Sequence, residues 1–257
     1  MTSATRHDPL VRPRHVVTAV LVAHDGARWL PTTLHAVKTQ RRPVQRFVAV
    51  DTGSRDETPA MLERAVGASS VLSAPRGCGF AAAAHLAVAA FATAPGLAST
   101  RSESGAPVEW IWLRHDDSAP TANALELLLE LDDEMTSAAV IGPKLVGWDD
   151  DRRLLEVGVT VDRGGRRETG LEPGELDHGQ HDGDRDVLAV STAGMLVRRD
   201  VWEQLGGLDR ALPLFRDDLD FGWRANLAGH RVVICTGAVV HHAEAAASGV
   251  RHIDAAT

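Results

Sequence analysis

Trp110-Ile-Trp-Leu-Arg-His-Asp-Asp-Ser118 is the stretch that decides the fold, because a short apolar run ends abruptly in two adjacent carboxylates. Aromatic and branched side chains suit a covered, pleated surface, so residues 110–113 are predicted to form a buried strand. Asp116 and Asp117 then follow the carboxyl end of that strand. They are expected at an exposed edge, where open α/β sheets bind their ligands.

The residues after this pair predict the start of a helix. Ser118 can cap it and Pro120 is tolerated in its first turn, while Leu125, Leu128 and Leu129 recur at helical spacing. The two acids could therefore simply cap a helix, and an isolated Asp-Asp pair favours that interpretation. Only the rest of the chain can distinguish a cap from a ligand site.

Composition indicates an ordinary globular chain of 257 residues, 44% hydrophobic and 24% charged. The formal net charge of -8 argues against a broad nucleic-acid surface, which carries a clustered basic excess. Cys78 and Cys235 lack zinc or CxxC spacing, which predicts two free thiols in a reducing compartment. No run approaches the roughly 20 apolar residues of a membrane span, so a cytoplasmic protein is expected.

Strands and helices alternate over the first half. The predicted order is strand 16–23, a helix from Leu30 that 40–43 ends, strand 47–50, helix 59–66, strand 71–72, helix 80–93, loop 94–107, strand 110–113 and strand 139–141, which Gly142-Pro143 ends. The helix at 80–93 has no polar face, which predicts burial or packing on both sides. The alternation specifies an α/β fold with a mostly parallel, doubly wound sheet.

The second half has a different texture. Expected there are an antiparallel strand at 154–162, a strand at 187–198, helices at 201–205 and 219–227, and strands at 232–235 and 239–242. Residues 170–186 have no apolar periodicity and predict a mobile surface loop. His178 and His181 lie in this loop among acids, but its low complexity favours solvated disorder over a metal cluster.

The last predicted helix carries Leu219, Trp223 and Leu227 on one face, which is expected to anchor it to the core. Trp202 and Phe221 are likewise interpreted as core residues rather than as a platform for a sugar. The acids of the first turn are then left free to point away from the core.

Four loops are expected to gather at the carboxyl edge of the parallel sheet: Ala23-His-Asp25, Asp51-Thr-Gly53, Arg76-Gly-Cys-Gly79 and Asp116-Asp117. Backbone amides and an acid there can bind a base and a ribose, and carboxylates can hold a divalent cation beside a diphosphate. The first strand is not followed by GxGxxG and the P-loop signature is absent, which disfavours both of those nucleotide sites.

Together the motifs resemble those of the family 2 glycosyltransferases, including rhamnosyl- and galactofuranosyltransferases, which have the GT-A fold. The resemblance covers residues 16–242. It rests on Ala23-His-Asp25, Val50-Asp-Thr-Gly-Ser-Arg-Asp-Glu-Thr58, Arg76-Gly-Cys-Gly-Phe80, His115-Asp-Asp117, Gly194-Met-Leu-Val-Arg-Arg199, Gly206-Gly-Leu-Asp209, Arg216-Asp-Asp-Leu-Asp220 with Arg224, and Ala238-Val-Val-His-His242.

This resemblance implies roles for individual residues. Asp51 matches the acid that contacts the base, residues 115–117 match the DxD-type motif, and Asp218 matches the general base. The implied set comprises Ala23, Asp25, Asp51, Gly77 and Asp116 for the nucleotide sugar, Asp117 and His242 for a metal ion, and Asp218 for catalysis.

Three departures from the family pattern bear on that set. His115 stands where many relatives have Asp, which leaves Asp117 as the surer metal ligand. Asp217 replaces the usual Glu beside the general base. His241 precedes His242, and alternation along a strand sends only one of the two into the site, so both remain candidates.

The implied activity is inverting transfer of a sugar from a nucleotide diphosphate sugar to an acceptor hydroxyl, in cell-wall or surface glycan synthesis. Oxygen ligands imply Mn²⁺ or Mg²⁺, and a histidine ligand favours Mn²⁺. The implied acceptor is a glycan or a lipid-linked sugar, and no nucleic acid is involved. Membrane association at the inner face would come from segments outside this chain.

One domain is expected, at 16–245, after a polar leader at 1–15 and before a tail at 246–257. Its nucleotide-sugar-binding half is 16–143, and its acceptor half, with a smaller antiparallel sheet, is 144–245.

Two other classes stay open. A nucleotidyltransferase would share the acids but should show a basic loop after the first strand, where this chain has Ala23-His24. A silent domain would bind a nucleotide sugar without turnover. For single residues, Asp51 could be a turn former, and Asp217 and Asp218 could merely favour the positive end of a helix, by about 0.3–1 kcal/mol each.

Overall fold

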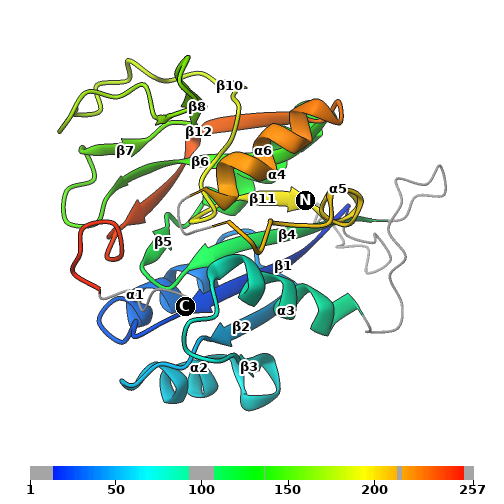
Figure 1. Ribbon diagram of the computed structural model, residues 1–257, viewed down its shortest axis with the longest axis vertical. Coiled ribbons are helices and arrows are strands. Elements are labelled where there is room, and N and C mark those ends of the chain that lie inside the picture. The colour runs from blue at the N-terminus through cyan, green and yellow to red at the C-terminus, as the bar shows by residue number, and fades with distance from the viewer. Residues whose placement is uncertain (1–13, 93–106, 136, 213–215, 252–257) are drawn as a thin grey trace, which may run out of the picture.

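A computed structural model describes residues 14–92, 107–135, 137–212 and 216–251 (Figure 1). Its centre is a ten-stranded sheet with the main strand order β10-β12-β6-β11-β4-β1-β2-β3, and a separate hairpin pairs β8 with β9. Most of the predicted leader, the predicted loop at 94–107 except residue 107, and the end of the predicted tail lie outside the described residues. The α/β architecture with a parallel core and a smaller antiparallel part confirms the predicted fold class.

Four parallel strands form the first half of the sheet: β1 (His15–Ala23), β2 (Arg46–Asp51), β3 (Val71–Ser73) and β4 (Val108–His115). All nine residues of β1 are buried, as a strand covered on both faces requires. Val22 pairs with Val50 on one side and with His115 on the other. This register brings the ends of β1, β2 and β4 to the same edge.

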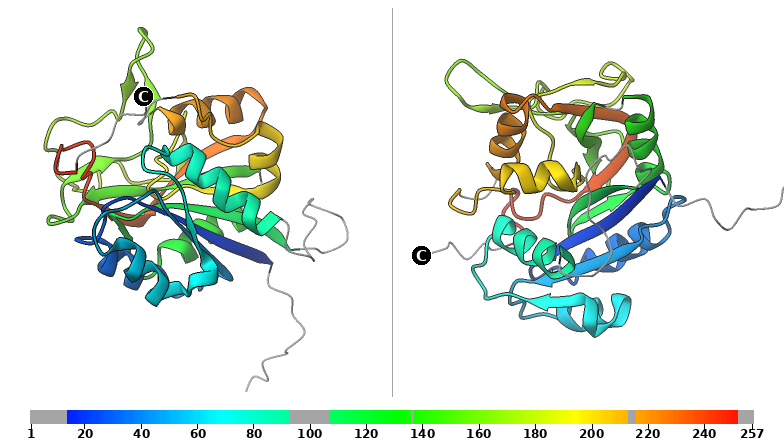
Figure 2. Two further views of the ribbon diagram at one scale, coloured as in Figure 1. Left: turned by 60° about the horizontal axis from the view of Figure 1, so that its bottom comes forward. Right: turned by 90° about the vertical axis from the view of Figure 1, so that its right-hand side faces the viewer.

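Helices cover both faces of the sheet (Figure 2). On one face lie α1 (Leu30–Lys38), α2 (Thr58–Val66) and α4 (Ala124–Glu134); on the other lie α3 (Phe80–Ala92), α5 (Arg199–Leu205) and α6 (Asp217–Leu227). Successive residues of β1 pack against opposite helical layers: Val20 packs with α3, and Leu21 packs with α1. The doubly wound arrangement follows from this alternation.

The second half extends the sheet with mixed pairing. β6 (Ala138–Gly147) and β12 (Arg231–His242) are parallel, and β11 (Leu196–Arg198) lies antiparallel between β6 and β4. Three short strands complete this sheet: β5 (Ser118–Pro120), β7 (Leu154–Glu156) and β10 (Arg185–Asp186). The separate hairpin consists of β8 (Thr160–Val161) and β9 (Arg167–Glu168). A 3₁₀ turn, Ala68–Ser70, precedes β3.

The structure corrects the predicted start of α4. Ser118 does not cap a helix, and Pro120 does not lie in a first turn, because both belong to β5, which pairs antiparallel with β12. The Ser118 hydroxyl accepts from the amide of His115 and donates to its carbonyl, and α4 begins only at Ala124. The sheet therefore continues through the turn that carries the two acids.

Other predicted boundaries were also wrong. β6 runs on through Gly142 and Pro143, and β12 is one strand with an irregularity between Cys235 and Val239 rather than two strands. The predicted strand at 187–198 is regular only from Leu196. The predicted strand at 154–162 divides into β7 and β8.

The packing of α6 differs from the prediction. Trp223 is 44% exposed and Leu227 is 78% exposed, so the face that was expected to anchor the helix points outward. Phe221, Gly222 and Ala225 are buried instead, and Trp202 packs against Phe221 as a core residue. Because the buried face is rotated, Asp217 and Asp218 of the first turn are buried in the protein.

Helix α3 also departs from the prediction of burial on both sides. Ala83, Ala84, Ala87 and Val88 pack in the core, whereas Leu86 is 40% exposed. The helix is therefore covered on one face only, although its sequence has no polar stripe to mark the other.

Residues 170–186 lack regular structure except at β10, as predicted, but charged contacts hold part of the segment. Lys144, buried in β6, donates to Asp177 at 2.7 Å and to Asp182 at 2.6 Å. His181 lies 2.8 Å from Glu175. Mobility of this loop stays a prediction, and these ion pairs are what it would have to break.

Among the described residues, no helix is both long and apolar enough to cross a membrane.

Gly26 provides a test of how the sheet edge is packed. A Cβ at Gly26 would lie 2.1 Å from Oδ2 of Asp116, so Gly26→Ala must displace that carboxylate. We expect the free energy of unfolding to fall by about 1–3 kcal/mol. Denaturant unfolding measures it, with Gly237→Ala as control because its Cβ would meet only Leu127, at 3.6 Å. Equal stability of the two variants would contradict this packing.

Candidate active site

The loops that follow β1, β2 and β4 meet at one edge of the sheet. The amide of His24 donates to Oδ2 of Asp116 at 2.8 Å, and the amide of Thr52 donates to the carbonyl of Ala23 at 3.0 Å. These bonds join three strand ends that are far apart in sequence. The predicted gathering of ligand loops at the carboxyl edge is therefore present.

The loop after β3 joins the same edge through Asp25 and Arg76. Their side chains form an ion pair at 2.7 Å, and Asp25 also accepts from the amide of Arg55 at 2.7 Å. The hydrogen bond from Arg76 holds the pKa of Asp25 down, at about 2, so the carboxylate is ionised at neutral pH. Gly77 follows with a φ of +91° and open space where a Cβ would stand.

Asp51 is nearly buried, and its carboxylate accepts from its own loop. Oδ2 lies 3.1 Å from the amide of Gly53, and both oxygens lie 3.3 Å from the amide of Ser54. Asp51 therefore shapes the turn after β2, the structural role that the sequence left open. These long bonds leave the acid at the edge of the sheet, where the resemblance places the base contact.

Asp116 is fixed from several sides. Its carbonyl accepts from the Thr33 hydroxyl at 2.8 Å, and the guanidinium of Arg251 lies 2.8 Å from Oδ1. Arg251 also lies over the ring of Trp29, 5.1 Å from the centroid. Burial raises the pKa of Asp116, and Arg251 opposes that effect. Contrary to the prediction of an exposed edge, Asp116 and Asp117 are almost fully buried.

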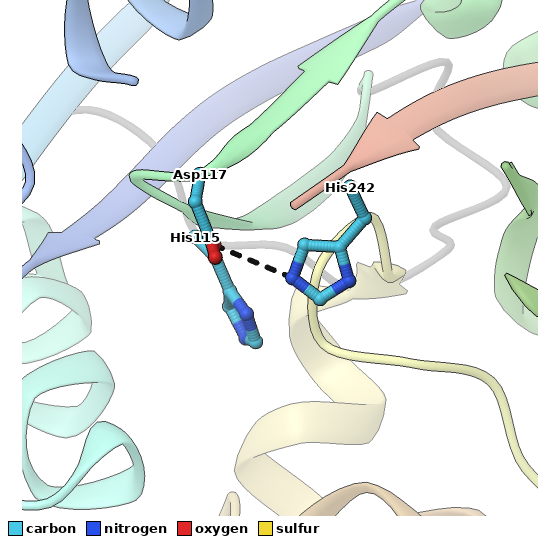
Figure 3. Close-up of side chains that lie close together, drawn as sticks. All are labelled: His115, Asp117 and His242. Atoms are coloured by element: carbon cyan, nitrogen blue, oxygen red, sulfur yellow. Dashed lines mark ion pairs between the residues drawn. The ribbon is translucent and has the colours of Figure 1, made fainter. Parts of the chain in front are cut away.

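Asp117, His115 and His242 form a separate cluster (Figure 3). His115 ends β4 and His242 ends β12, and Oδ1 of Asp117 lies 3.3 Å from Nε2 of His242. One ligand atom from each of the three residues can be chosen so that all lie within 4.8 Å of one another. Asp116 is not part of this group, and of the two adjacent histidines it is His242, not His241, whose ring lies beside Asp117.

The charges in this cluster suit a cation. Burial lowers the pKa of His115 to about 3, so its imidazole is neutral and can donate an electron pair. Burial works against the ionised form of Asp117, but the hydrogen bond and charge of His242 outweigh it and hold the pKa of Asp117 low. His115 also contacts the Thr192 hydroxyl at 3.0 Å, which orients its ring.

A second group of potential ligands, His15, Asp132 and Asp133, lies at the opposite end of β1. There, Nε1 of Trp110 donates to Nδ1 of His15 at 3.2 Å, and Nε2 of His15 lies 2.9 Å from Asp133. Both ring nitrogens have protein partners, so this group ties the strand to α4.

The acids at the start of α6 are buried. Arg167 in β9 contacts Asp218 at 3.3 Å and makes a shorter ion pair with Glu156 in β7. Burial raises the pKa of Asp218, and Arg167 opposes that rise. Burial, reinforced by the charge of Asp218, raises the pKa of Asp217 to about 6. Ionisation of Asp218 thus depends on Arg167, and not only on the end of the helix.

Several residues of this site were missed from the sequence. Arg251 follows His242 by nine positions, in a stretch that was predicted to be a tail. Glu156 and Arg167 belong to short strands without a strong pattern, and nothing local marks them as partners of Asp218. Of the missed residues, only His115 could have been proposed as a metal ligand from the sequence, because it occupies the first position of the DxD-type motif.

Comparison with known proteins gives the class. The chain belongs to the family described as "Glycosyltransferase like family 2", whose model matches residues 13–254. Over 63 residues it is 40% identical to the O-antigen biosynthesis protein RfbC of Myxococcus xanthus. That match covers 24% of this chain and 5% of RfbC. The resemblance found in the motifs is thereby confirmed at the level of the family.

Solved structures share the fold at low sequence identity. GalNAc-T7, solved with UDP, GalNAc and Mn²⁺, gives a TM-score of 0.61 at 12% identity over 88% of this chain and 43% of its own. The mannosyltransferase PcManGT of Pyrobaculum calidifontis, with GDP-Man and Mn²⁺, gives 0.60 at 16% over 92% and 58%. TarS of S. aureus, with UDP-GlcNAc, gives 0.56 at 14% over 87% and 58%.

Asp51→Ala separates the two roles of this acid. Loss of the turn contacts should cost about 1 kcal/mol of stability, because each bond is long and the amides can be hydrated. Affinity for UDP or GDP should fall more, by at least about tenfold, if Asp51 contacts the base. Thermal unfolding and calorimetry measure the two effects. A large loss of stability with unchanged affinity would assign Asp51 to structure alone.

Proposed function

We propose that the chain is an inverting glycosyltransferase that moves a sugar from a nucleotide diphosphate sugar to an acceptor hydroxyl. The observation that supports this most is the cluster of Asp117, His115 and His242 at the ends of β4 and β12. It lies in a chain of glycosyltransferase-like family 2, whose structural neighbours were solved with nucleotide sugars or their products. Cell-wall or surface glycan synthesis is the proposed setting, in keeping with the match to RfbC.

The proposed donor site is the edge formed by Ala23, Asp25, Asp51, Gly77 and Asp116. Asp25 is ionised beside Arg76, and Gly77 offers accessible backbone, which suits a ribose and a phosphate respectively. Asp116 is already compensated by Arg251, so a ribose contact suits it better than a metal contact. The nucleotide would then lie across the ends of β1, β2 and β4.

The residues of the cluster fit a divalent cation. Asp117 supplies an ionised oxygen and His115 a neutral nitrogen, and His242 lies opposite Asp117. One carboxylate with two imidazoles favours Mn²⁺ over Mg²⁺. When bound, the cation would stabilise the negative charge of the departing diphosphate. Asp117 and His242 are the proposed principal ligands.

Asp218 is the proposed general base. As the acceptor oxygen bonds to the anomeric carbon, Asp218 takes the proton of that hydroxyl. The bond from the anomeric carbon to the diphosphate oxygen breaks at the same time, and its electron pair leaves with the diphosphate. Attack from the face opposite the leaving group inverts the anomeric configuration. Asp218 must be ionised for this, so turnover should fall as the pH drops through its raised pKa.

The acceptor is proposed to be a glycan or a lipid-linked sugar that enters beside α6 and the β8–β9 hairpin, where Asp218 lies. The alternatives make different predictions. A nucleotidyltransferase would release pyrophosphate from a nucleoside triphosphate, and a silent binding domain would release nothing. Release of nucleoside diphosphate from a panel of donors, with acceptor present, distinguishes the three.

Nucleoside diphosphate binding should require a divalent cation, because two phosphates and the nearby acids repel one another without it. Calorimetry with UDP or GDP should detect binding when Mn²⁺ is present and no binding when excess chelator is added. His242→Ala should lower the affinity at least about tenfold. His241→Ala is the matched control and should leave it unchanged. Affinity that survives chelation would refute the metal site.

Asp218→Asn should lower turnover at least about 10²-fold, or about 2.7 kcal/mol in the barrier, because it removes the base and keeps the shape. Donor affinity should stay within a few-fold of the wild type. Asp217→Asn and Asp220→Asn should cost less, since Asp220 already pairs with Arg224 at 2.6 Å. If Asp218→Asn is fully active and Asp217→Asn is inactive, the general base is Asp217 and not Asp218.

A further inference from the structure

Asp218 shares one guanidinium with a second buried carboxylate. Arg167 contacts Oδ2 of Asp218 at 3.3 Å, whereas its ion pair with Oε2 of Glu156 is shorter. Glu156 and Asp218 are both almost fully buried, and Arg167 is about a third exposed. The guanidinium is thus held mainly by Glu156 and only loosely by Asp218.

Glu156 is itself firmly placed. Its Oε1 accepts from the amide of Ser191 at 2.9 Å, so one oxygen is fixed by the backbone while the other holds Arg167. The three groups come from different elements, β7, β9 and α6, which are brought together only by the fold. Two buried carboxylates thus share one guanidinium: burial raises the pKa of both Glu156 and Asp218, and Arg167 opposes that rise at each.

A general base needs two properties that oppose each other. It must be ionised when the acceptor arrives, which a nearby cation favours, and it must still accept a proton, which a close ion pair prevents. A guanidinium at 3.3 Å that is retained by another acid meets both requirements. Asp217 also faces this region from the same helical turn, whereas Asp220 is turned toward Arg224.

We propose that Glu156 is a positioning residue for Asp218. Glu156 holds Arg167 in an ion pair, so that the guanidinium favours the ionised form of Asp218 without forming a close ion pair with it. The inference rests on the proposed function of Asp218 as the base. It predicts that Glu156 acts through Arg167 rather than through direct repulsion between the two acids. Without Glu156, Arg167 would close on Asp218 as a full charge-assisted pair and make it a poorer proton acceptor.

Direct titration of Asp218 tests this without any knowledge of the sugar. Carbon-13 carboxylate NMR of aspartate-labelled protein gives its apparent pKa, and Asp218→Asn assigns the resonance. Glu156→Gln keeps an acceptor for Ser191 and should lower that pKa by about one unit; Arg167→Gln should raise it by about one unit. Arg231→Gln, which breaks a surface pair with Asp186 at 2.8 Å, is the control and should change nothing.

The double variant carries the decisive result. If Glu156 acts through Arg167, adding Glu156→Gln to Arg167→Gln should shift the pKa by less than about a third of the single effect. An undiminished shift would mean direct repulsion and overturn the proposal, as would single variants that shift in the same direction or not at all. Should Glu156→Gln fail to fold, Glu156→Asp, which draws the carboxylate back from Arg167, must show a smaller shift of the same sign.

Kinetics distinguish failure of this inference from failure of the base assignment. An inactive Asp218→Asn together with unshifted titrations would leave Asp218 as the base and refute the role of Glu156. An active Asp218→Asn would refute the base itself, whatever the titrations show. In the supported case Glu156→Gln lowers kcat at neutral pH by several-fold, with the donor KM unchanged.

Discussion

The pairing of Asp117 with the end of β12 is the contact on which the site depends. Asp117 lies 3.3 Å from His242, its Oδ2 accepts from the amide of Ala245 at 2.9 Å, and its carbonyl accepts from the amide of Ala243 at 3.0 Å. One residue of the β4–β5 turn thereby anchors the last strand and the segment after it. The edge at which β1, β2 and β4 end and the second half of the sheet are joined at this point.

This anchoring explains why so much charge is buried there. Arg114, fully buried at the end of β4, donates to the carbonyl of Ser118 at 2.6 Å and lies over the ring of Trp112. Burial lowers its pKa to about 9, which still leaves it charged at neutral pH. The positive charge of Arg114 interacts favourably with Asp117 and offsets part of the cost of burying that acid.

Sequence patterns correctly predicted those elements whose burial is visible in a short stretch of the chain. The apolar run of β1 and the motif after Trp112 placed the parallel core and its edge, because burial on both faces leaves a continuous apolar signature. Ser118 was assigned to a helix because its partner strand lies more than a hundred residues away. The exposed Trp223 and Leu227 share the helical spacing of a core face, so periodicity alone chose the wrong side of α6. Glu156, Arg167 and Arg251 acquire their roles only through tertiary contacts.

Arg251 gives the free protein a counter-ion of its own. Because its guanidinium already lies against Asp116 and over Trp29, Asp116 is the compensated acid of the turn, and Asp117 is the acid that lies with His115 and His242. A ligand that binds Oδ1 of Asp116 therefore has to displace Arg251 from that oxygen first.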